Sequence, residues 1–261
     1  MNEVLNYYNG YDEESRLNKN NAHKLEYLTS IYYLDKVIKP GSRILDVGAG
    51  TGKYAFYLAN KGFSVTAGDI VPRFVELMRE KLNYSTLSMD IYCEDACDLS
   101  RFDSCSYDAV LCMGPLYHLK EEKDRSTVVE QCLRVLKQDG IIVSAYINRF
   151  ASYVLEFMGS EDLSKDRAIL EDTLHKGYNT REKLSSFYFS YPQEIEALMS
   201  AQNVEKIFNI GTDGIAYLIG SKINNLTEQE YSYWVDYHLK TCENESLIGH
   251  SLHGLYIGKR K

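Results

Sequence analysis

The sequence lacks the features that mark several large classes of protein. Its 261 residues contain no run of about 18 apolar residues, so no membrane span is predicted. The first residues are polar and acidic, which disfavours a secretion signal or a transit peptide. The six cysteines are scattered and match no zinc-ligand spacing. We therefore expect reduced thiols, a cytoplasmic location and no metal site.

The chain also lacks an excess of basic residues and a flexible linker. Its formal net charge of −8 disfavours a nucleic-acid partner, because phosphate binding requires basic surface. Proline is rare, with 4 residues, and no stretch rich in Gly, Ser or Pro divides the chain. Hydrophobic residues at 44% and charged residues at 25% are typical of globular proteins. These values predict a single globular domain spanning residues 1–261.

The chain does contain a regular alternation of predicted strands and helices. Strands are predicted at 43–47, 63–69, 89–95, 107–113, 141–147, 204–210 and 252–258. Helices are predicted at 53–61, 73–82, 121–137 and 192–201, and after a capping box formed by Thr227 and Glu230. Gly62 and Gly140 are expected to end two of these helices. The alternation predicts an α/β fold with a doubly wound, mostly parallel seven-stranded sheet.

Three regions fall outside this alternation. Residues 1–40 precede the first strand and are expected to form an N-terminal helical cap. Residues 148–190 are aromatic and charged without a strand signal, and residues 211–250 contain a further helical stretch. We expect both insertions to lie over one edge of the sheet as a helical lid. Their aromatic residues would suit either a small-molecule pocket or the face of a homodimer.

A glycine loop follows the first predicted strand. The sequence DVGAGTG at 46–52 lies between a strand and a helix, as a nucleotide-binding loop requires. Glycine lets the backbone turn sharply and lets a ligand approach it closely. Asp69 ends the second predicted strand, where a carboxylate can accept hydrogen bonds from both ribose hydroxyls. A dinucleotide loop would have glycine in place of Lys53, and Asp46 would repel a pyrophosphate, so the loop favours a cationic or zwitterionic nucleoside.

These residues resemble the motifs of a known family. DVGAGTG followed by AGDI is similar to the first two motifs of class I S-adenosylmethionine-dependent methyltransferases. CEDACDL, YDAVLCMGPLYHL and LRVLKQDGIIVSAY, beginning at residues 93, 107 and 133, resemble the motifs of strands three, four and five. The resemblance is closest to the small-molecule branch related to ubiquinone-biosynthesis methyltransferases. It implies a Rossmann-like fold, S-adenosylmethionine as cofactor, S-adenosylhomocysteine as product and in-line methyl transfer to a small molecule.

The resemblance also implies a set of cofactor-binding residues. The glycines of the 46–52 loop would hold the methionine part of the cofactor, Asp69 would bind the ribose and Asp95 would bind the adenine amine. A role as a helix N-cap would also explain Asp95. In the aromatic segment with Tyr7 and Tyr8, Tyr11 would shield the sulfonium and Arg16 would pair with the methionine carboxylate. The full set is Asp46, Gly48, Ala49, Gly50, Gly52, Asp69, Ile70, Asp95, Ala96, Met113, Tyr11 and Arg16.

The candidates for catalysis directly follow the fourth predicted strand. His118 can take a proton from a hydroxyl or an ammonium near neutral pH, and Tyr117 is adjacent to it. A helix cap or ordinary packing would explain His118 equally well. His250 and His253, near the last strand, are further candidates.

Several functional alternatives remain open at the level of sequence. An RNA or protein methyltransferase is disfavoured, because residues 113–116 read MGPL where methyltransferases of base amines and glutamine amides have [DN]-P-P-[YF]. A non-catalytic module that binds S-adenosylmethionine would have the same glycine loop. The sequence does not identify the methylated atom, which can be oxygen, nitrogen or carbon.

Overall fold

The strands form one mixed sheet. The computed structural model describes residues 2–181 and 184–261, and its sheet has the order β3-β2-β1-β4-β5-β8-β7, with β6 paired to β5. The strands are β1 Arg43–Val47, β2 Ser64–Gly68, β3 Met89–Tyr92, β4 Tyr107–Cys112, β5 Leu136–Asn148, β6 Phe189–Ser190, β7 Val204–Gly211 and β8 His253–Arg260. Only β8 runs antiparallel to its neighbours. The predicted doubly wound α/β fold is confirmed, and the two-residue β6 is an additional strand.

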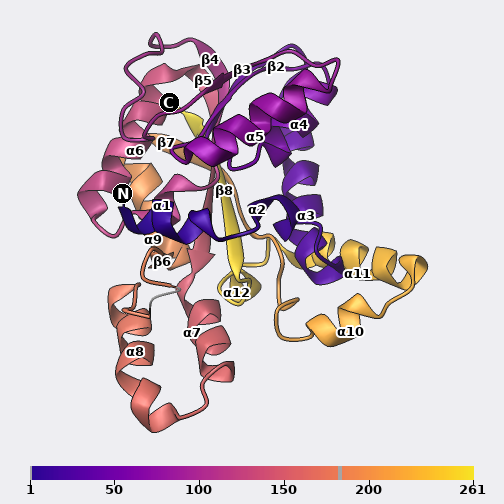
Figure 1. Ribbon diagram of the computed structural model, residues 1–261, viewed down its shortest axis with the longest axis vertical. Coiled ribbons are helices and arrows are strands. Elements are labelled where there is room, and N and C mark those ends of the chain that lie inside the picture. The colour runs from indigo at the N-terminus through magenta and orange to yellow at the C-terminus, as the bar shows by residue number, and fades with distance from the viewer. Residues whose placement is uncertain (1, 182–183) are drawn as a thin grey trace.

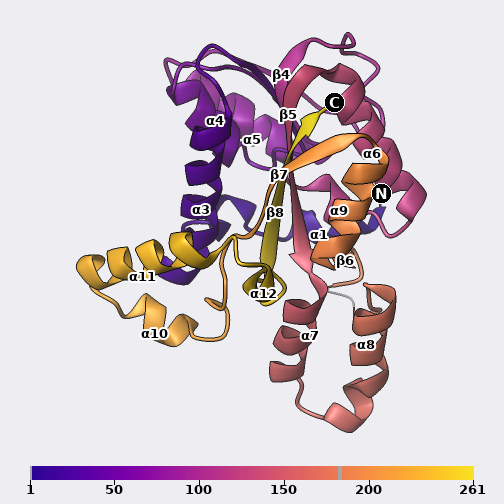
Figure 2. The same cartoon turned by 180° about the vertical axis from the view of Figure 1, so that it is seen from behind.

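Helices cover both faces of this sheet (Figures 1 and 2). They are α1 Asn2–Asn9, α2 Glu13–Arg16, α3 Asn21–Val37, α4 Lys53–Asn60, α5 Pro72–Asn83, the 3-10 helix η1 Pro115–His118, α6 Glu122–Val135, α7 Arg149–Met158, α8 Leu163–Lys176, α9 Pro192–Ala201, α10 Gly220–Asn224, α11 Glu228–Thr241 and α12 Glu245–Ile248. The helices α3, α4 and α5 pack on one face, and α6 and α9 pack on the other. None of the helices in the described part of the chain is long and apolar enough to cross a membrane.

The strand residues explain why both faces need a cover. Ile44 and Leu45 are adjacent in β1 and both fully buried, but they belong to different hydrophobic cores. Leu111 and Val110 in β4 divide between the two cores in the same way. Successive side chains of a strand point to opposite faces, so continuous apolar strands require helices on both sides. This layering brings the carboxyl ends of β1, β2 and β4 to one edge.

The end of α6 differs from the prediction. The helix stops at Val135, and Leu136 already pairs with Tyr107 of β4 as the first residue of β5. The register then shifts, and Asp139 adopts a φ of 61° before regular pairing resumes. Gly140 therefore lies in an irregular start of β5, and the prediction that it closes α6 is wrong. The predicted capping box of Thr227 and Glu230 is confirmed at the start of α11.

Both insertions project from the carboxyl edge of the sheet, but they diverge. In Figure 1, α7 and α8 extend below the sheet, whereas α10 and α11 extend to the lower right. The expected absence of a strand in 148–190 is wrong, because Phe189 pairs with Ile147 at the end of β5. The N-terminal segment with α1 and α2 crosses the same edge (Figure 1). The roles of these segments as cap and lid stay predictions.

Gly254→Ala tests the close packing within the sheet. A Cβ at Gly254 in β8 would overlap the ring of Tyr146. That ring cannot move freely, since its hydroxyl donates to Asn209 Oδ1 at 2.7 Å. We expect the free energy of unfolding, measured with urea, to fall by about 1–3 kcal/mol. Gly10→Ala is the control, because no atom lies within 4 Å of its Cβ position; equal losses in both variants would contradict the packing argument.

Candidate functional site

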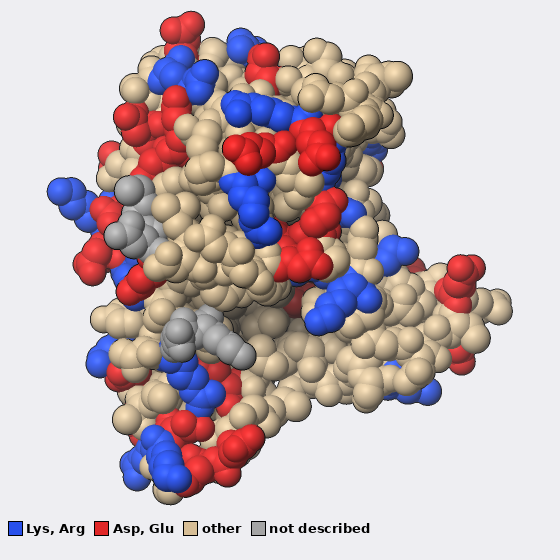
Figure 3. All heavy atoms as spheres, viewed as in Figure 1, with Lys and Arg blue, Asp and Glu red and all other residues tan. Residues whose placement is uncertain are grey.

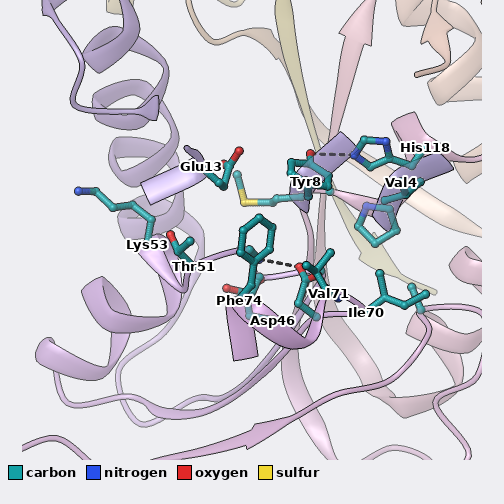
Figure 4. Close-up of a pocket in the computed structure, with 18 of the residues that line it drawn as sticks. Val4, Tyr8, Glu13, Asp46, Thr51, Lys53, Ile70, Val71, Phe74 and His118 are labelled. Atoms are coloured by element: carbon teal, nitrogen blue, oxygen red, sulfur yellow. Dashed lines mark hydrogen bonds between the residues drawn. The ribbon is translucent and has the colours of Figure 1, made fainter. Parts of the chain in front are cut away.

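A cavity of about 160 Å³ lies at the carboxyl ends of β1, β2 and β4. Its walls come from the N-terminal segment and from the loops that follow β1, β2, β3 and β4. Ligands of open α/β sheets bind at this edge. In Figure 4, Glu13 and Tyr8 reach over one side of the cavity, opposite Asp46. All the residues predicted to bind cofactor or act in catalysis line this cavity, except Gly52, Tyr11 and the further catalytic candidates His250 and His253.

The glycine loop is shaped by positive φ angles and close contacts. Gly48, Gly50 and Gly52 have φ angles of 70°, 55° and 84°, which residues with a Cβ rarely adopt. A Cβ at Gly48 would lie 2.7 Å from Cδ of Pro115. A Cβ at Gly52 would lie 2.9 Å from Cγ of Met78 in α5. Gly48 and Gly50 therefore form the cavity wall, whereas Gly52 lies behind the loop and makes room for α5.

Asp69 holds this loop in place. Its Oδ2 accepts a hydrogen bond from the Gly50 N–H at 2.8 Å, and its Oδ1 accepts one from the Val71 N–H at 2.8 Å. Burial raises the pKa of Asp69 to about 6, although the two amides oppose the shift. Each carboxylate oxygen can accept a second hydrogen bond. Asp69 can therefore fix the loop and bind a hydroxyl-bearing ligand at the same time.

Asp46 gives the cavity an uncompensated acidic group. The residue is 1% exposed, and its Oδ2 has no hydrogen-bond partner among the described residues. Burial and the nearby Asp69 raise the pKa of Asp46 to about 7. Burial also raises the pKa of Glu13, which lines the same cavity. An unpaired buried carboxylate is costly, so this cavity favours a ligand with a positive charge.

Asp95 and Ala96 line the far side of the cavity. The Asp95 Oδ1 accepts a hydrogen bond from the Cys97 N–H at 2.9 Å, within a turn. No helix follows this turn before the described strand β4, so the interpretation of Asp95 as a helix N-cap is wrong. Ile70, after β2, and Met113, after β4, also line the cavity.

His118 is neutral and hydrogen-bonded at both nitrogens. Its Nδ1 lies 2.9 Å from the Ser186 carbonyl oxygen, which can only accept, so Nδ1 carries the hydrogen. Its Nε2 then accepts from the Tyr8 hydroxyl at 2.9 Å, as the dashed line in Figure 4 shows. Burial lowers the pKa of His118 to about 4. The neighbouring Tyr117 donates its hydroxyl hydrogen to the Met113 carbonyl at 3.0 Å.

A second cavity of about 290 Å³ adjoins the first. The residues that line both cavities are Tyr8, Glu13, Arg16 and Tyr117. Tyr11 lines only the second cavity. Tyr8, and not Tyr11 as expected, lines the first cavity. Figure 3 shows a hollow with largely uncharged walls between the sheet with its helices and the two helical insertions.

Arg16 is engaged with two carboxylates. Its Nη1 and Nη2 donate to the two oxygens of Glu26 at 2.7 and 3.1 Å, and its Nε donates to Glu13 at 2.9 Å. Behind it, His253 Nδ1 lies 2.7 Å from Asp213 Oδ2. Burial lowers the pKa of His253, but Glu26 and Asp213 outweigh this effect and raise it overall.

One ligand atom each of Glu26, Asp213 and His253 lies within 4.8 Å of the others. The Arg16 guanidinium already neutralises part of their charge, and His253 and Ser251 donate hydrogen bonds to Asp213. We therefore interpret this group as a hydrogen-bond network behind the cavities rather than as a metal centre. His250 is exposed at the surface.

Residues 45–144 match the family model of a methyltransferase domain. A ubiquinone biosynthesis O-methyltransferase from Xanthomonas campestris pv. campestris is 31% identical over 144 residues, which make up 55% of this chain and 59% of that protein. Residues 45–144 are therefore similar to a methyltransferase domain. The match covers less than two thirds of the relative.

Solved structures share the fold of this chain over most of its length. An S-adenosylmethionine-dependent methyltransferase from Methanosarcina mazei has a TM-score of 0.62 at 18% identity, with 87% of this chain and 96% of that chain covered. A protein from Pyrococcus horikoshii has a TM-score of 0.63 at 17% identity, with 97% and 100% covered. At these identities the likeness concerns the fold.

The first cavity fits S-adenosylmethionine, the cofactor named for the solved methyltransferase from Methanosarcina mazei. The fit rests on the positive φ angles of Gly48 and Gly50, which residues with a Cβ rarely adopt, and on the unpartnered Oδ2 of Asp46. The first feature lets a ligand approach the backbone, and the second favours the positive charge that the cofactor carries. Tyr8 and Glu13 are additional lining residues that the sequence motifs do not indicate.

Asp46→Asn tests the unpaired carboxylate. The pKa of Asp46 is raised from about 3.8 to about 7, so the folded state holds this proton more tightly than the unfolded state. Ionisation of this group therefore lowers the free energy of unfolding as the pH rises through this range. Asparagine cannot ionise. Between pH 5 and pH 8 the free energy of unfolding of the variant should therefore fall by about 2–3 kcal/mol less than that of the wild type.

Urea unfolding at the two pH values measures this difference. Asp90→Asn, at an exposed position of β3, is the matched control and should follow the wild type. An Asp46→Asn variant with the wild-type pH dependence would show that Asp46 carries no raised pKa.

Proposed function

We propose that this protein transfers a methyl group from S-adenosylmethionine to a small molecule. The observation that carries the proposal is the meeting of two cavities at Tyr8, Glu13, Arg16 and Tyr117. One cavity has the glycine loop, and the other has aromatic walls. Methyl transfer requires a donor and an acceptor held end to end with water excluded. The O-methyltransferase named among the relatives supports the same chemistry.

In this proposal, the carboxyl edge of the sheet binds the nucleoside. Asp69 accepts from the ribose hydroxyls through the free lone pairs of its oxygens. Asp95 accepts from the adenine amine, and the Ala96 backbone lies beside the ring. The backbone of residues 48–50 contacts the methionine part, and Met113 borders the sulfur.

The charged residues bind the amino-acid end. Glu13 and Asp46 are the candidates for the ammonium group, because burial raises the pKa of both carboxyls and a cation would lower it. Arg16 stays the candidate for the methionine carboxylate. A guanidinium has five N–H donors, and the hydrogen bonds to Glu13 and Glu26 leave two of them for a ligand.

Tyr8 and His118 are suited to receive a proton from the acceptor. Bound S-adenosylmethionine supplies an activated methyl group on a positively charged sulfur, which a nucleophile takes by in-line displacement. The Tyr8 hydroxyl lines both cavities and donates to the neutral Nε2 of His118. Tyr8 can therefore accept a proton from the acceptor and pass its own to His118. The Nδ1–H bond to Ser186 keeps the ring in this tautomer.

The surface charge supports a small-molecule acceptor. On the face shown in Figure 3, Lys and Arg alternate with Asp and Glu around the hollow. A nucleic-acid acceptor would require a contiguous basic surface. The walls of the second cavity are instead apolar and aromatic, as in sites for small molecules.

Calorimetry with S-adenosylhomocysteine tests the cofactor site. Asp69→Asn removes one acceptor of a charged hydrogen bond, so binding should weaken by about 1.5–3 kcal/mol. Gly50→Val should abolish binding, because valine strains a φ of 55°. Asp103→Asn, an exposed position, is the control. Wild-type affinity in Asp69→Asn would remove the ribose assignment, and no binding by the wild type would refute the proposed function.

His118→Ala and Tyr8→Phe test the proton path. Turnover should fall by about 10²-fold or more, because a positioned proton acceptor contributes factors of this size. The affinity for S-adenosylhomocysteine should stay within a few-fold of the wild type, since neither change removes a group assigned to the cofactor. The measurement is transfer of a labelled methyl group to acceptors on which the wild type is active. An unchanged rate in His118→Ala would exclude His118 from the mechanism.

A further inference from the structure

Glu156 of α7 lines the second cavity and has one oxygen without a hydrogen-bond partner among the described residues. The residue lines this cavity and is 5% exposed. Its Oε1 accepts hydrogen bonds from Thr173 Oγ1 at 3.0 Å and from Asn179 Nδ2 at 2.8 Å. Its Oε2 has no hydrogen-bond partner within residues 2–181 and 184–261. A buried carboxylate oxygen in this state favours a ligand that brings a hydrogen-bond donor.

The surrounding residues hold Glu156 in place. Thr173 and Asn179 are almost fully buried, and the Asn179 Nδ2 also donates to Thr173 Oγ1 at 2.9 Å. The Asn179 Oδ1 accepts from the Arg181 N–H at 3.1 Å, which orients the amide. Because these donors hold Oε1, Oε2 is the oxygen left for a ligand. The carboxylate is therefore a built part of the cavity wall and not a mobile surface group.

Much of the remaining wall is apolar and rich in rings. Aromatic and aliphatic side chains surround the cavity; they include Tyr7 of α1, Tyr11 after α1, Leu155 of α7, Phe187 before β6 and Phe189 of β6. A volume of about 290 Å³ suits a small molecule with an apolar body. Aromatic faces also stabilise a cation that lies against them.

The charges around this cavity are unbalanced toward the acidic side. Glu13 and Glu156 line it, and Glu26 and Asp213 lie directly behind its Arg16 and His253. Near Glu156, the Arg181–Asp166 ion pair adds one cation and one carboxylate. Carboxylates therefore still outnumber the cations even when the imidazole is protonated. Burial lowers the pKa of His23, the other lining imidazole, and so favours its neutral form. Burial raises the pKa of Glu156, and a cation on Oε2 would lower it again.

We propose that the methyl acceptor is a small ammonium compound with an apolar, ring-containing body, and that its ammonium group donates a hydrogen bond to Oε2 of Glu156. The role as acceptor rests on the proposed function, whereas the recognition of an ammonium group rests on this cavity alone. Glu156 lines only the second cavity, so the group that it holds is a recognition group apart from the junction at Tyr8 and Tyr117.

Matched ligands separate charge from shape. One set is 2-phenylethylammonium, 2-phenylethanol and 3-phenylpropionate, and the other is tryptamine, tryptophol and indole-3-propionate. Calorimetry on the full chain, with and without saturating S-adenosylhomocysteine, gives their affinities. In at least one set the ammonium member should bind about 10-fold more tightly than the alcohol, equivalent to about 1.4 kcal/mol, and the acid more weakly than both. Glu156→Gln should abolish this preference, because the amide has the same shape without the charge.

Two control variants separate this role from a structural one. Thr173→Val removes a neutral hydrogen bond to Oε1 but keeps the carboxylate, so the ammonium preference should persist even if stability falls. Glu171→Gln removes a charge at an exposed position of α8 and should leave the preference unchanged. If Glu156→Gln does not fold, the test of the proposal is whether the wild type binds the ammonium compound more tightly than the alcohol in the two ligand sets.

The proposal is overturned if the alcohols bind as tightly as the ammonium compounds in both sets, or if the preference survives in folded Glu156→Gln. Absence of S-adenosylhomocysteine binding to the wild type refutes the proposed function instead. The ammonium preference measured without that compound then still decides whether the cavity recognises a cation.

Discussion

The carboxylate of Asp69 is the link on which the cofactor side of this protein depends. It joins the loop after β1, through the Gly50 N–H, to the segment after β2, through the Val71 N–H. The strands are already paired in parallel, so these two hydrogen bonds fix the shape of the loop at their carboxyl ends. The same oxygens face a cavity and keep acceptor capacity. One buried charge thus builds the site and remains available to a ligand, with a pKa raised to about 6.

The acidic residues at this edge connect stability with binding. Asp46 and Glu156 each have an oxygen without a hydrogen-bond partner among the described residues, and they belong to different cavities. Each buries negative charge at a cost that a cationic ligand offsets. A ligand that binds only the folded state shifts unfolding in proportion to its affinity. Under the proposed function, occupancy of both cavities would therefore raise the free energy of unfolding.

The sequence predicts the sheet and the glycine loop well, because both depend on local patterns. Alternating apolar strands and helices define the layers, and the spacing of the loop from Asp69 follows from one strand–helix–strand unit. The contact between Tyr8 and His118 joins residues 110 positions apart, and no periodicity indicates it. Gly52 matches the loop motif but serves the packing of α5. No sequence pattern distinguishes Glu156 from other acidic residues. Its burial and its unpaired oxygen depend on packing against α8, which only the tertiary structure shows.

The excursion through α7 and α8 leaves the sheet after Asn148 and returns to it at Phe189, which pairs with Ile147 at the end of the same strand. Its two ends are therefore neighbours, and the rest of the sheet does not have to adjust to what lies between them. Under the proposed function, exchange of α7 and α8 for helices with different side chains would alter which acceptors bind, as long as the Ser186 carbonyl still accepts a hydrogen bond from His118. Replacement of these two helices is therefore one route by which specificity for the acceptor can diversify.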